Sequence, residues 1–418
     1  MWYVVQGALR GDRPRDVVRR STIVAMVSFL TLTDLFGAQA LLPRLVEAFG
    51  TDAATMGVAV NAATFGMAVS GLVVAWFADR IDRKRGVWIS LACLTVPTFL
   101  LGLVDDVGLF LALRVAQGAF MAAAFTLTMT YLSEECDVTA AGGAMAAYIT
   151  GNVAANLFGR ILAVSAADMF GLTGFFWIFA ALNLVGAALA LSLFGPRDAR
   201  PPMRAGSPAA AWGRHLARPA LRSAFAMGFA ILFVFVGVFT YVNLHLTDAL
   251  GVDEDLLGVV YLVFLPALFT TPYAAKAVSR FGPQRVFQAA GVASLAGVGL
   301  TLAPSLALVL AGLAIIGAGT FFMQAAATGF VGRTAEGDRA AANGLYLTSY
   351  YIGGLVGALA LGRAHEIGAW PLVAGIVALA LAATLLLAGA LRHPGPEVLP
   401  KRLQAGAQAA LKGDNRDG

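Results

Sequence analysis

The most regular feature of this chain is a series of long apolar stretches separated by short polar segments. A stretch of about 20 apolar residues lets an α-helix cross the hydrocarbon core of a bilayer. Twelve such stretches occur, and each is predicted to form a helix. Their approximate bounds are 21–43, 55–78, 86–104, 107–132, 141–165, 169–194, 221–247, 255–278, 286–303, 305–330, 340–362 and 367–391.

The composition excludes an ordinary water-soluble protein. Hydrophobic side chains make up 59% of the chain and charged ones 13%, and the mean hydropathy is +0.77. Soluble domains average roughly a quarter charged residues and less than half apolar ones. Lipid must therefore be the solvent for much of the surface, and we expect an all-α membrane protein with twelve transmembrane helices.

The basic residues follow the loops rather than forming a patch. Of the 29 Lys and Arg residues, 25 fall before, between or after the predicted helices on one side, two (Arg44 and Arg363) lie on the other, and two (Arg114 and Arg160) lie inside helices. Basic loops stay in the cytoplasm, so both termini are expected there. The net charge of +5 is a topology signal, and no nucleic-acid partner is expected. Met1–Arg20 is too basic for a cleaved signal peptide.

The chain divides into two halves of six predicted helices. The longest polar connection is rich in Pro, Gly and Arg and is predicted to be a linker. A sequence pattern that begins at Tyr148 recurs at Tyr346, a shift of about 200 residues. Parallel repeats of this kind are one plan of transporters, with the substrate site between the halves. The expected segments are a cytoplasmic N-terminal segment (1–20), two bundles (21–194 and 221–391), a linker (195–220) and a cytoplasmic tail (392–418).

Enzymatic chemistry has no recognisable motif here. Cys93 and Cys136 offer neither a disulfide framework nor repeated metal-ligand spacing. The chain has no phosphate-binding Walker loop, no zinc-binding HExxH motif and no nucleophile elbow. We therefore expect no enzyme, no cofactor and no metal.

The loop between the second and third predicted helices, from Gly71 to Arg85, resembles the signature of the major facilitator superfamily. The signature is a glycine, three residues, then Asp-Arg, any residue and Gly-Arg-Lys. The match covers Asp79, Arg80, Arg83 and Lys84. Ala75 and Asp82 replace glycines. The resemblance implies a gating loop that latches the halves in the outward-facing state, and the alternative is a basic cluster that only sets the topology.

Arg114, followed by Gln117 and Gly118 in the fourth predicted helix, resembles a second motif of the same superfamily. An intramembrane Arg needs a wet cavity or a counter-charge. Asp34 in the first helix lies at a similar depth, about 14 Å below Pro43, while Arg114 lies about 10 Å below the start of its helix. Resemblance to proton-coupled exporters implies that Asp34 and Arg114 act together in proton coupling. A static ion pair is the alternative.

The fifth predicted helix resembles the arabinose-efflux-like, YnfM-type branch of drug:H+ antiporters. It carries a Gly-Asn pair at Asn152, then Asn156, and ends in a Gly-Arg pair at Arg160. Arg160 has no counterpart in the repeat, which favours a place in the substrate cavity over a position at the membrane interface. Gly353 and Gly357 form a face of small residues in the eleventh helix, which we expect to pack against the second helix.

Other polar side chains at membrane depth complete the expected substrate cavity. The predicted cavity residues are Gln39, Asn152, Asn156, Arg160, Gln324 and Tyr350. Each polar residue alone can equally well form a hydrogen bond between helices. His245 lies near the outer end of the seventh helix, where a titrating switch and an interface histidine both remain open.

These observations predict a secondary transporter of a bacterial inner membrane that works by alternating access, as a monomer, with a small-molecule substrate, protons and lipid as partners. We expect proton-coupled efflux of a small apolar or amphipathic compound. Two alternatives stay open. One is proton-coupled transport of an organic anion or metabolite, and the other is an assembly factor of the same fold that transports nothing.

Overall fold

The computed structural model describes residues 14–77, 81–135, 138–193, 208–253, 257–335 and 339–391. Within these ranges all regular secondary structure is helical. In the first half the helices are α2 (Pro14–Ala40), α3 (Leu42–Phe49), α4 (Ala53–Phe77), α5 (Arg83–Leu101), α6 (Val107–Glu135) and α7 (Val138–Leu193). After the short α8 (Pro208–Ala217) follow α9 (Pro219–Asp248), α10 (Leu257–Val260), η3 (Tyr261–Phe264), α11 (Leu265–Thr270), η4 (Thr271–Tyr273), α12 (Ala274–Phe281), α13 (Pro283–Leu300), α14 (Leu306–Thr334), α15 (Arg339–Leu387) and η5 (Ala388–Leu391).

Two of these helices each contain two crossings. The 56 residues of α7 would reach about 84 Å as a straight helix, far beyond the roughly 30 Å core of a bilayer. Gly171, with φ 70°, interrupts α7, and Gly368 with Ala369 interrupts α15. Each break lets the chain reverse, so each long helix forms an antiparallel pair.

A third crossing is broken into short pieces. Between Leu257 and Phe281 the backbone alternates between α-helical and tighter 3₁₀ turns, with η3 and η4 between α10, α11 and α12. Pro266 and Pro272 lie in the first turns of α11 and η4. Because proline has no N–H to donate, the regular α-helical ladder cannot run through these positions. The sequence predicted this segment as one continuous helix, so the break is a correction.

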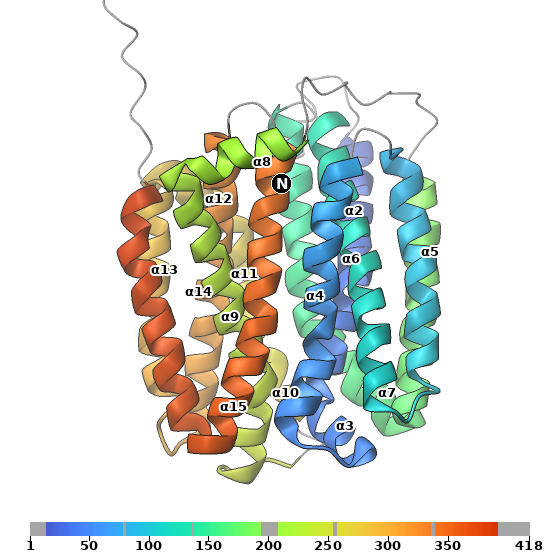
Figure 1. Cartoon of the computed structure of the whole chain (residues 1–418), viewed down its shortest axis with the longest axis vertical. Coiled ribbons are helices and arrows are strands. Elements are labelled where there is room, and N and C mark those ends of the chain that lie inside the picture. Colours follow the sequence, from blue (N-terminus) through green and yellow to red (C-terminus); the bar gives the residue numbers. More distant parts are fainter. Residues whose placement is uncertain are drawn as a thin grey trace, which may run out of the picture.

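The described part of the chain has twelve crossings, which confirms the predicted fold class. Eight helices are long and apolar enough to cross a membrane, and the breaks in α7 and α15 divide two of them. The interrupted segment from Leu257 to Phe281 and the 18-residue α13 complete the set. Figure 1 shows α2–α7 together on one side, α9–α15 on the other, and α8 across one end of the bundle. That end is called the α8 end below, and the opposite one the α3 end.

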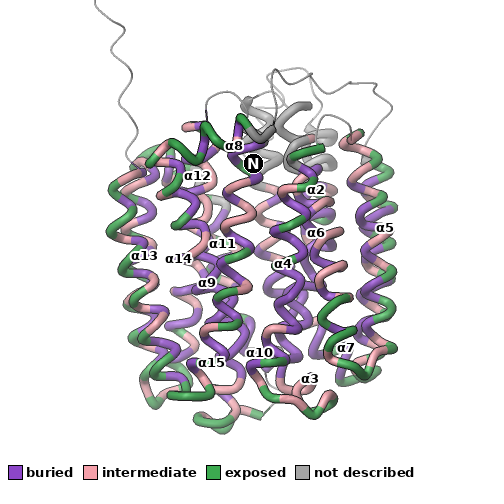
Figure 2. Tube along the Cα trace, viewed as in Figure 1, coloured by how far each residue is buried: buried purple, intermediate pink, exposed green. Residues whose placement is uncertain are grey.

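Burial follows the pattern of a protein that faces lipid. Figure 2 shows buried segments inside the bundle and exposed ones along its flanks and ends. Large apolar side chains are exposed, including Phe269 at 69% and Leu379 at 72%. The interior instead contains polar and charged groups, among them Asp34, Arg114 and Arg160. In a water-soluble protein such charged side chains would be expected on the surface. Their burial in the bundle of a membrane protein indicates where the functional site lies.

Small residues set the distance between several helices. A side chain at Gly353 or Gly357 would collide with the backbone of α9 at Phe229 or Phe233. These glycines therefore let α15 approach α9, and the expected packing of this face against α4 is wrong. The helix α15 does run beside α4 (Figure 1), where the Thr348 hydroxyl donates to the carbonyl of Ala68 at 3.2 Å.

Candidate functional site

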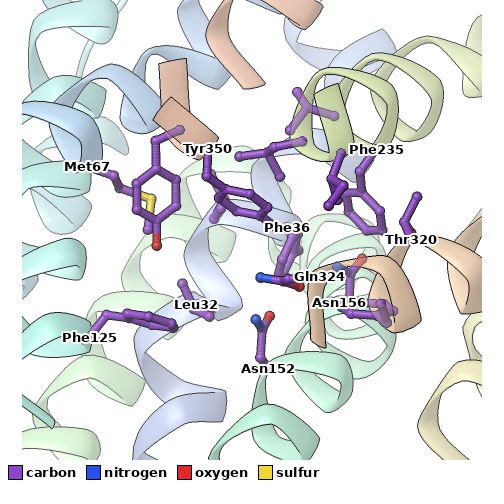
Figure 3. Close-up of a pocket in the computed structure, with 16 residues that line it drawn as sticks. Leu32, Phe36, Met67, Phe125, Asn152, Asn156, Phe235, Thr320, Gln324 and Tyr350 are labelled. Atoms are coloured by element: carbon purple, nitrogen blue, oxygen red, sulfur yellow. The ribbon is translucent and has the colours of Figure 1, made fainter. Parts of the chain in front are cut away.

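A narrow cavity lies between the two halves, lined by side chains of both (Figure 3). It encloses about 30 Å³, room for roughly two water molecules. Its walls are mostly apolar and aromatic. They consist of Leu32, Leu35, Phe36, Met67, Phe125, Asn152, Asn156, Ile231, Leu232, Phe235, Val236, Thr320, Phe321, Gln324, Tyr350 and Tyr351.

Four of the six predicted cavity residues line this space: Asn152, Asn156, Gln324 and Tyr350. Figure 3 shows the amides of Asn152 and Gln324, from opposite halves, directed toward the same region beside Phe36. The other two, Gln39 and Arg160, are absent from the lining. Arg160 instead bonds to the lining residue Asn156, and Gln39 bonds to Arg160.

Arg160 is fully buried and, among the described residues, bonds to neutral groups. Its Nε donates to Oδ1 of Asn156 at 3.2 Å, Nη1 to the carbonyl of Phe239 at 3.3 Å, and Nη2 to Oε1 of Gln39 at 2.6 Å. The guanidinium also lies 4.7 Å from the ring centre of Tyr261, a cation–π contact. These partners come from both halves of the protein, so Arg160 bridges the interface between them.

A chain of amides continues from Arg160 across the interface. Gln39 donates from Nε2 to Oδ1 of Asn61 at 2.7 Å. Asn61 donates in turn to the carbonyl of Gly57 at 2.9 Å and to the hydroxyl of Thr240 at 3.3 Å. The network holds α2, α4 and α9 together. The sequence marks Asn61 as a polar residue in an apolar span, but its link to Arg160 depends on the rotation of α4, which spacing alone does not fix.

Asp34 lies in a second polar cluster, inside the first half. Its Oδ2 accepts hydrogen bonds from the Thr98 hydroxyl at 3.0 Å, from Nε2 of Gln117 at 3.0 Å and from Nδ2 of Asn183 at 2.8 Å. These residues belong to α5, α6 and α7, respectively. Sequence reasoning missed Thr98 and Asn183. A lone Asn in the otherwise apolar span of 169–194 was the available signal.

Arg114 lies beside this cluster. It donates from Nε at 2.9 Å and from Nη2 at 2.7 Å to the carbonyl of Val60, and from Nη1 at 3.5 Å to the backbone carbonyl of Asp34. Nη1 also donates to Oε1 of Gln117. Gln117 therefore accepts from Arg114 through its oxygen and donates to Asp34 through its nitrogen, and so links the two charged residues.

The structure thus brings Asp34 and Arg114 together, but through Gln117 rather than as a direct ion pair. Between described side chains the ion pairs are Arg44–Asp168 and Arg363–Glu366. Neither Asp34 nor Arg114 lines the cavity. On α2 the neighbours Leu35 and Phe36 face it, while the Asp34 side chain points into the first half. The coupling role of the pair stays a prediction.

The two charged interior sites differ in electrical balance. Arg114 has one carboxylate close by, that of Asp34. In the described ranges Asp34 is the only buried carboxylate, and it bonds to Thr98, Gln117 and Asn183 inside the first half. Arg160 therefore has no buried acidic partner among the described residues. A buried charge without an opposite charge is unfavourable, which marks the Arg160 site as unusual.

The predicted gating loop is described only in part. Asp79 and Arg80 lie outside the described residues, and Arg83 and Lys84 are in the first turn of α5. Asp82, which replaces the family's glycine, is the N-cap of α5, because its Oδ1 accepts from the backbone N–H of Arg85 at 2.9 Å. The charge added by Asp82 therefore stabilises a helix start. The latch role of this loop stays a prediction.

His245, whose role the sequence left undecided, lies near the α3 end. Its ring stacks on Trp370 with centroids 5.1 Å apart and planes inclined by 10°. The contact joins α9 to the last crossing, as packing between helices of the second half.

Comparison with known proteins identifies one family. The model described as Major Facilitator Superfamily matches residues 24–270 and 242–413. The inner membrane transport protein YnfM of Escherichia coli (strain K12) is 28% identical over 397 residues, covering 90% of this chain and 93% of that protein. The uncharacterized MFS-type transporter YybF of Bacillus subtilis (strain 168) is 26% identical, covering 86% and 90%.

Solved structures agree on the fold. A mutant of the nucleoside transporter NupG superposes with a TM-score of 0.68 at 16% identity, covering 89% of this chain and 99% of that chain. A bacterial homolog to the human lysosomal transporter Spinster, in an inward-facing and occupied conformation, gives a TM-score of 0.67 at 16% identity, covering 91% and 97%. At this identity the likeness concerns the fold alone.

Proposed function

The chain belongs to the major facilitator superfamily, and we propose that it exports a small apolar or amphipathic compound across the bacterial inner membrane in exchange for protons. Membership makes it a multi-pass membrane transporter rather than an enzyme. The direction, the proton coupling, the antiporter branch and the class of cargo are the proposed part. The observation that carries the cargo class is the cavity, whose lining is largely apolar and aromatic.

The cavity is too small for cargo in this conformation. About 30 Å³ holds roughly two waters, so binding requires the two halves to separate. Such rocking of one half against the other around a central site is how transporters of this plan work. The site lies within one chain, which supports a monomer as the working unit.

Asp34 is the proposed proton carrier. It is the only buried carboxylate of the described residues, and burial away from water favours the neutral form of such a group, whereas Arg114 nearby favours the charged form. The helix that carries Asp34 also places Leu35 and Phe36 on the cavity. Cargo that pushes Phe36 therefore shifts α2 against α5, α6 and α7, and changes the hydrogen bonds that stabilise the carboxylate.

The proposed orientation puts the α8 end in the cytoplasm, with both termini. Fourteen basic residues of the described ranges belong to that end, and two, Arg44 and Arg363, to the α3 end. Those at the α8 end are Arg15, Arg19, Arg20, Arg83, Lys84, Arg85, Arg214, Arg218, Arg222, Lys276, Arg280, Arg285, Arg333 and Arg339. Positive loops remain on the cytoplasmic side, so this asymmetry supports the orientation.

The test is a screen of small compounds on purified protein in proteoliposomes that contain a pH indicator. A cargo that moves against protons changes the internal pH in protein-containing vesicles and leaves protein-free vesicles unchanged. A cargo that moves without any pH change contradicts the proton coupling. If no compound moves and the protein instead copurifies with a fixed partner, the assembly-factor alternative is supported.

A further inference from the structure

We propose that the cargo is an amphipathic compound with one anionic oxygen group, bound by Asn156 with Arg160 behind it. The inference rests on the proposed transport function and adds the charge of the substrate and the residues that recognise it. It begins from a mismatch in the interior: three charged side chains are buried among the Asp, Glu, Lys and Arg residues that the structure describes, and two of them are positive.

Asp34 and Arg114 balance each other through Gln117, which leaves the charge of Arg160 uncompensated. Gln39, Asn156 and the carbonyl of Phe239 supply only partial negative charges. The rings that flank the guanidinium, Tyr261 at 4.7 Å and Phe36 at 5.6 Å, are neutral as well. An anion nearby would be strongly favoured in such a dry, low-dielectric place.

Asn156 connects this charge to the cavity. Its Oδ1 accepts from Nε of Arg160 at 3.2 Å. This bond fixes the orientation of the amide and leaves its Nδ2 as the group available to bind cargo. That Nδ2 is buried and has no hydrogen-bond partner among the described residues, on a residue that is 1% exposed and lines the cavity. A buried donor without an acceptor is unfavourable. An acceptor oxygen on the cargo would satisfy it, and the adjacent positive charge favours an anionic one.

The backbone around Arg160 supports a binding role. Tyr261 and Phe264, against which the guanidinium packs, belong to the 3₁₀ turn η3 of the broken crossing. Interrupted helices near the middle of the bundle are where transporters of this plan bind their substrates. The rest of the cavity is apolar and aromatic, with Phe36, Phe235 and Phe321 among its walls. A carboxylate attached to an apolar body fits both the site formed by Asn156 and Arg160 and the apolar walls of the cavity.

A competing interpretation is that Arg160 only fastens the two halves together, because its contacts cross the interface. In that case removing its charge would alter stability or the balance of conformations, and it would not alter the preference for charged over neutral cargo. A measurement of the preference for charged over neutral cargo therefore distinguishes the two interpretations.

The experiment compares isosteric probes that differ in charge. Full-length protein in mild detergent is titrated with 2-naphthoate and 2-naphthamide, and with octanoate and octanamide, and dissociation constants are taken from the shift of the thermal unfolding midpoint. We expect the carboxylates to bind about ten to a hundred times more tightly than the amides. Equal or tighter binding of the amides, or no binding of either carboxylate at millimolar concentration, overturns the proposal.

Asn156→Asp is the decisive variant, because it is isosteric and gives Arg160 the counter-charge that it lacks. The new carboxylate forms an ion pair with Arg160 and repels an anionic cargo, so we expect an unchanged or raised unfolding midpoint and loss of the carboxylate preference. Asn343→Asp is the matched control, since Asn343 is exposed and its change should leave the preference intact. Retention of the preference in Asn156→Asp contradicts the proposal.

Two further variants test the charge itself. Arg160→Lys should keep a carboxylate preference, and Arg160→Gln should lose it; an equal preference in both contradicts the proposal. The result is separable from the proton-coupling proposal. Carboxylate-selective binding without proton-coupled movement would support this inference and contradict the proposed proton coupling. Proton-coupled export of neutral or cationic compounds would contradict this inference and support the proton coupling.

Discussion

Replacing Asp34 by asparagine should destabilise the protein far less than replacing it by leucine. Both substitutions remove the charge, and leucine also removes the acceptor. Oδ2 of Asp34 accepts from Thr98, Gln117 and Asn183 at 2.8–3.0 Å. If Asp34 is protonated during transport, the fold must tolerate a neutral group there, and asparagine imitates that neutral state.

The hydrogen bonds set the size of the difference. In Asp34→Leu the Thr98 hydroxyl still has the Leu94 carbonyl at 2.9 Å, and it still accepts from Gln117 at 2.8 Å and from Asn183 at 3.2 Å. The second N–H of each of these two amides, however, loses the carboxylate oxygen that accepted from it. Each buried donor left unpaired costs about 1–3 kcal/mol, so the variant should lose about 4 kcal/mol of unfolding free energy. In Asp34→Asn the weaker bonds to a neutral oxygen are offset by the removal of a buried charge, and we expect a loss of about 1 kcal/mol.

The free energy of unfolding can be measured by reversible unfolding in mixed micelles of SDS and a mild detergent, followed by tryptophan fluorescence. Asp105→Asn is the matched control, because Asp105 is exposed and should change stability by less than about 0.5 kcal/mol. An Asp34→Asn variant as unstable as Asp34→Leu would refute the reasoning. The charge itself would then hold the fold, and Asp34 would be part of a static pair with Arg114.

Three other predictions concern packing, capping and topology. Gly353→Ala should lower the free energy of unfolding by about 1–3 kcal/mol in the same assay, because the new methyl group meets the backbone of Phe229. Gly299→Ala is the control and should be neutral or stabilising, because nothing lies within 4 Å of a methyl group at that position. The Thr55 hydroxyl and backbone N–H lower the pKa of Asp52 to about 2 from 3.8. Asp52→Ala should therefore lower the free energy of unfolding by about 1 kcal/mol above pH 4. This difference in stability from wild type should vanish as the pH falls through 2. Alkaline phosphatase fused after residue 395 should be inactive in cells if the C-terminus is cytoplasmic, and high activity would contradict the orientation.

The fold could be predicted from the sequence because its main signal is one-dimensional. A run of about 20 apolar residues is itself evidence for a crossing, and each of the twelve predicted segments overlaps a crossing of the structure. The broken segment shows the limit. Pro266 and Pro272 were visible in the sequence, but a proline inside an apolar run leaves open whether the helix bends or separates into 3₁₀ turns.

The site was harder to predict because it depends on how each helix is rotated. Depth along the membrane placed Asp34 and Arg114 at the same level, and they are close. Depth does not specify which face of α2 Asp34 occupies, so the separation of Asp34 from the cavity and its bond to Asn183 were beyond the sequence. The same limit explains Gly353, whose small face was visible although its partner helix was not.

Uphill transport by wild type and Asp34→Asn in proteoliposomes tests the central claim most directly. The cargo identified by the pH screen is loaded against a concentration gradient, driven by an imposed pH difference, and compared with counterflow exchange at equal pH. The account predicts that Asp34→Asn loses pH-driven accumulation and keeps exchange, because exchange requires only that the cargo-loaded protein change conformation, with no proton bound or released at residue 34. Accumulation by Asp34→Asn with the pH dependence of wild type would contradict the account and leave Asp34 as scaffold.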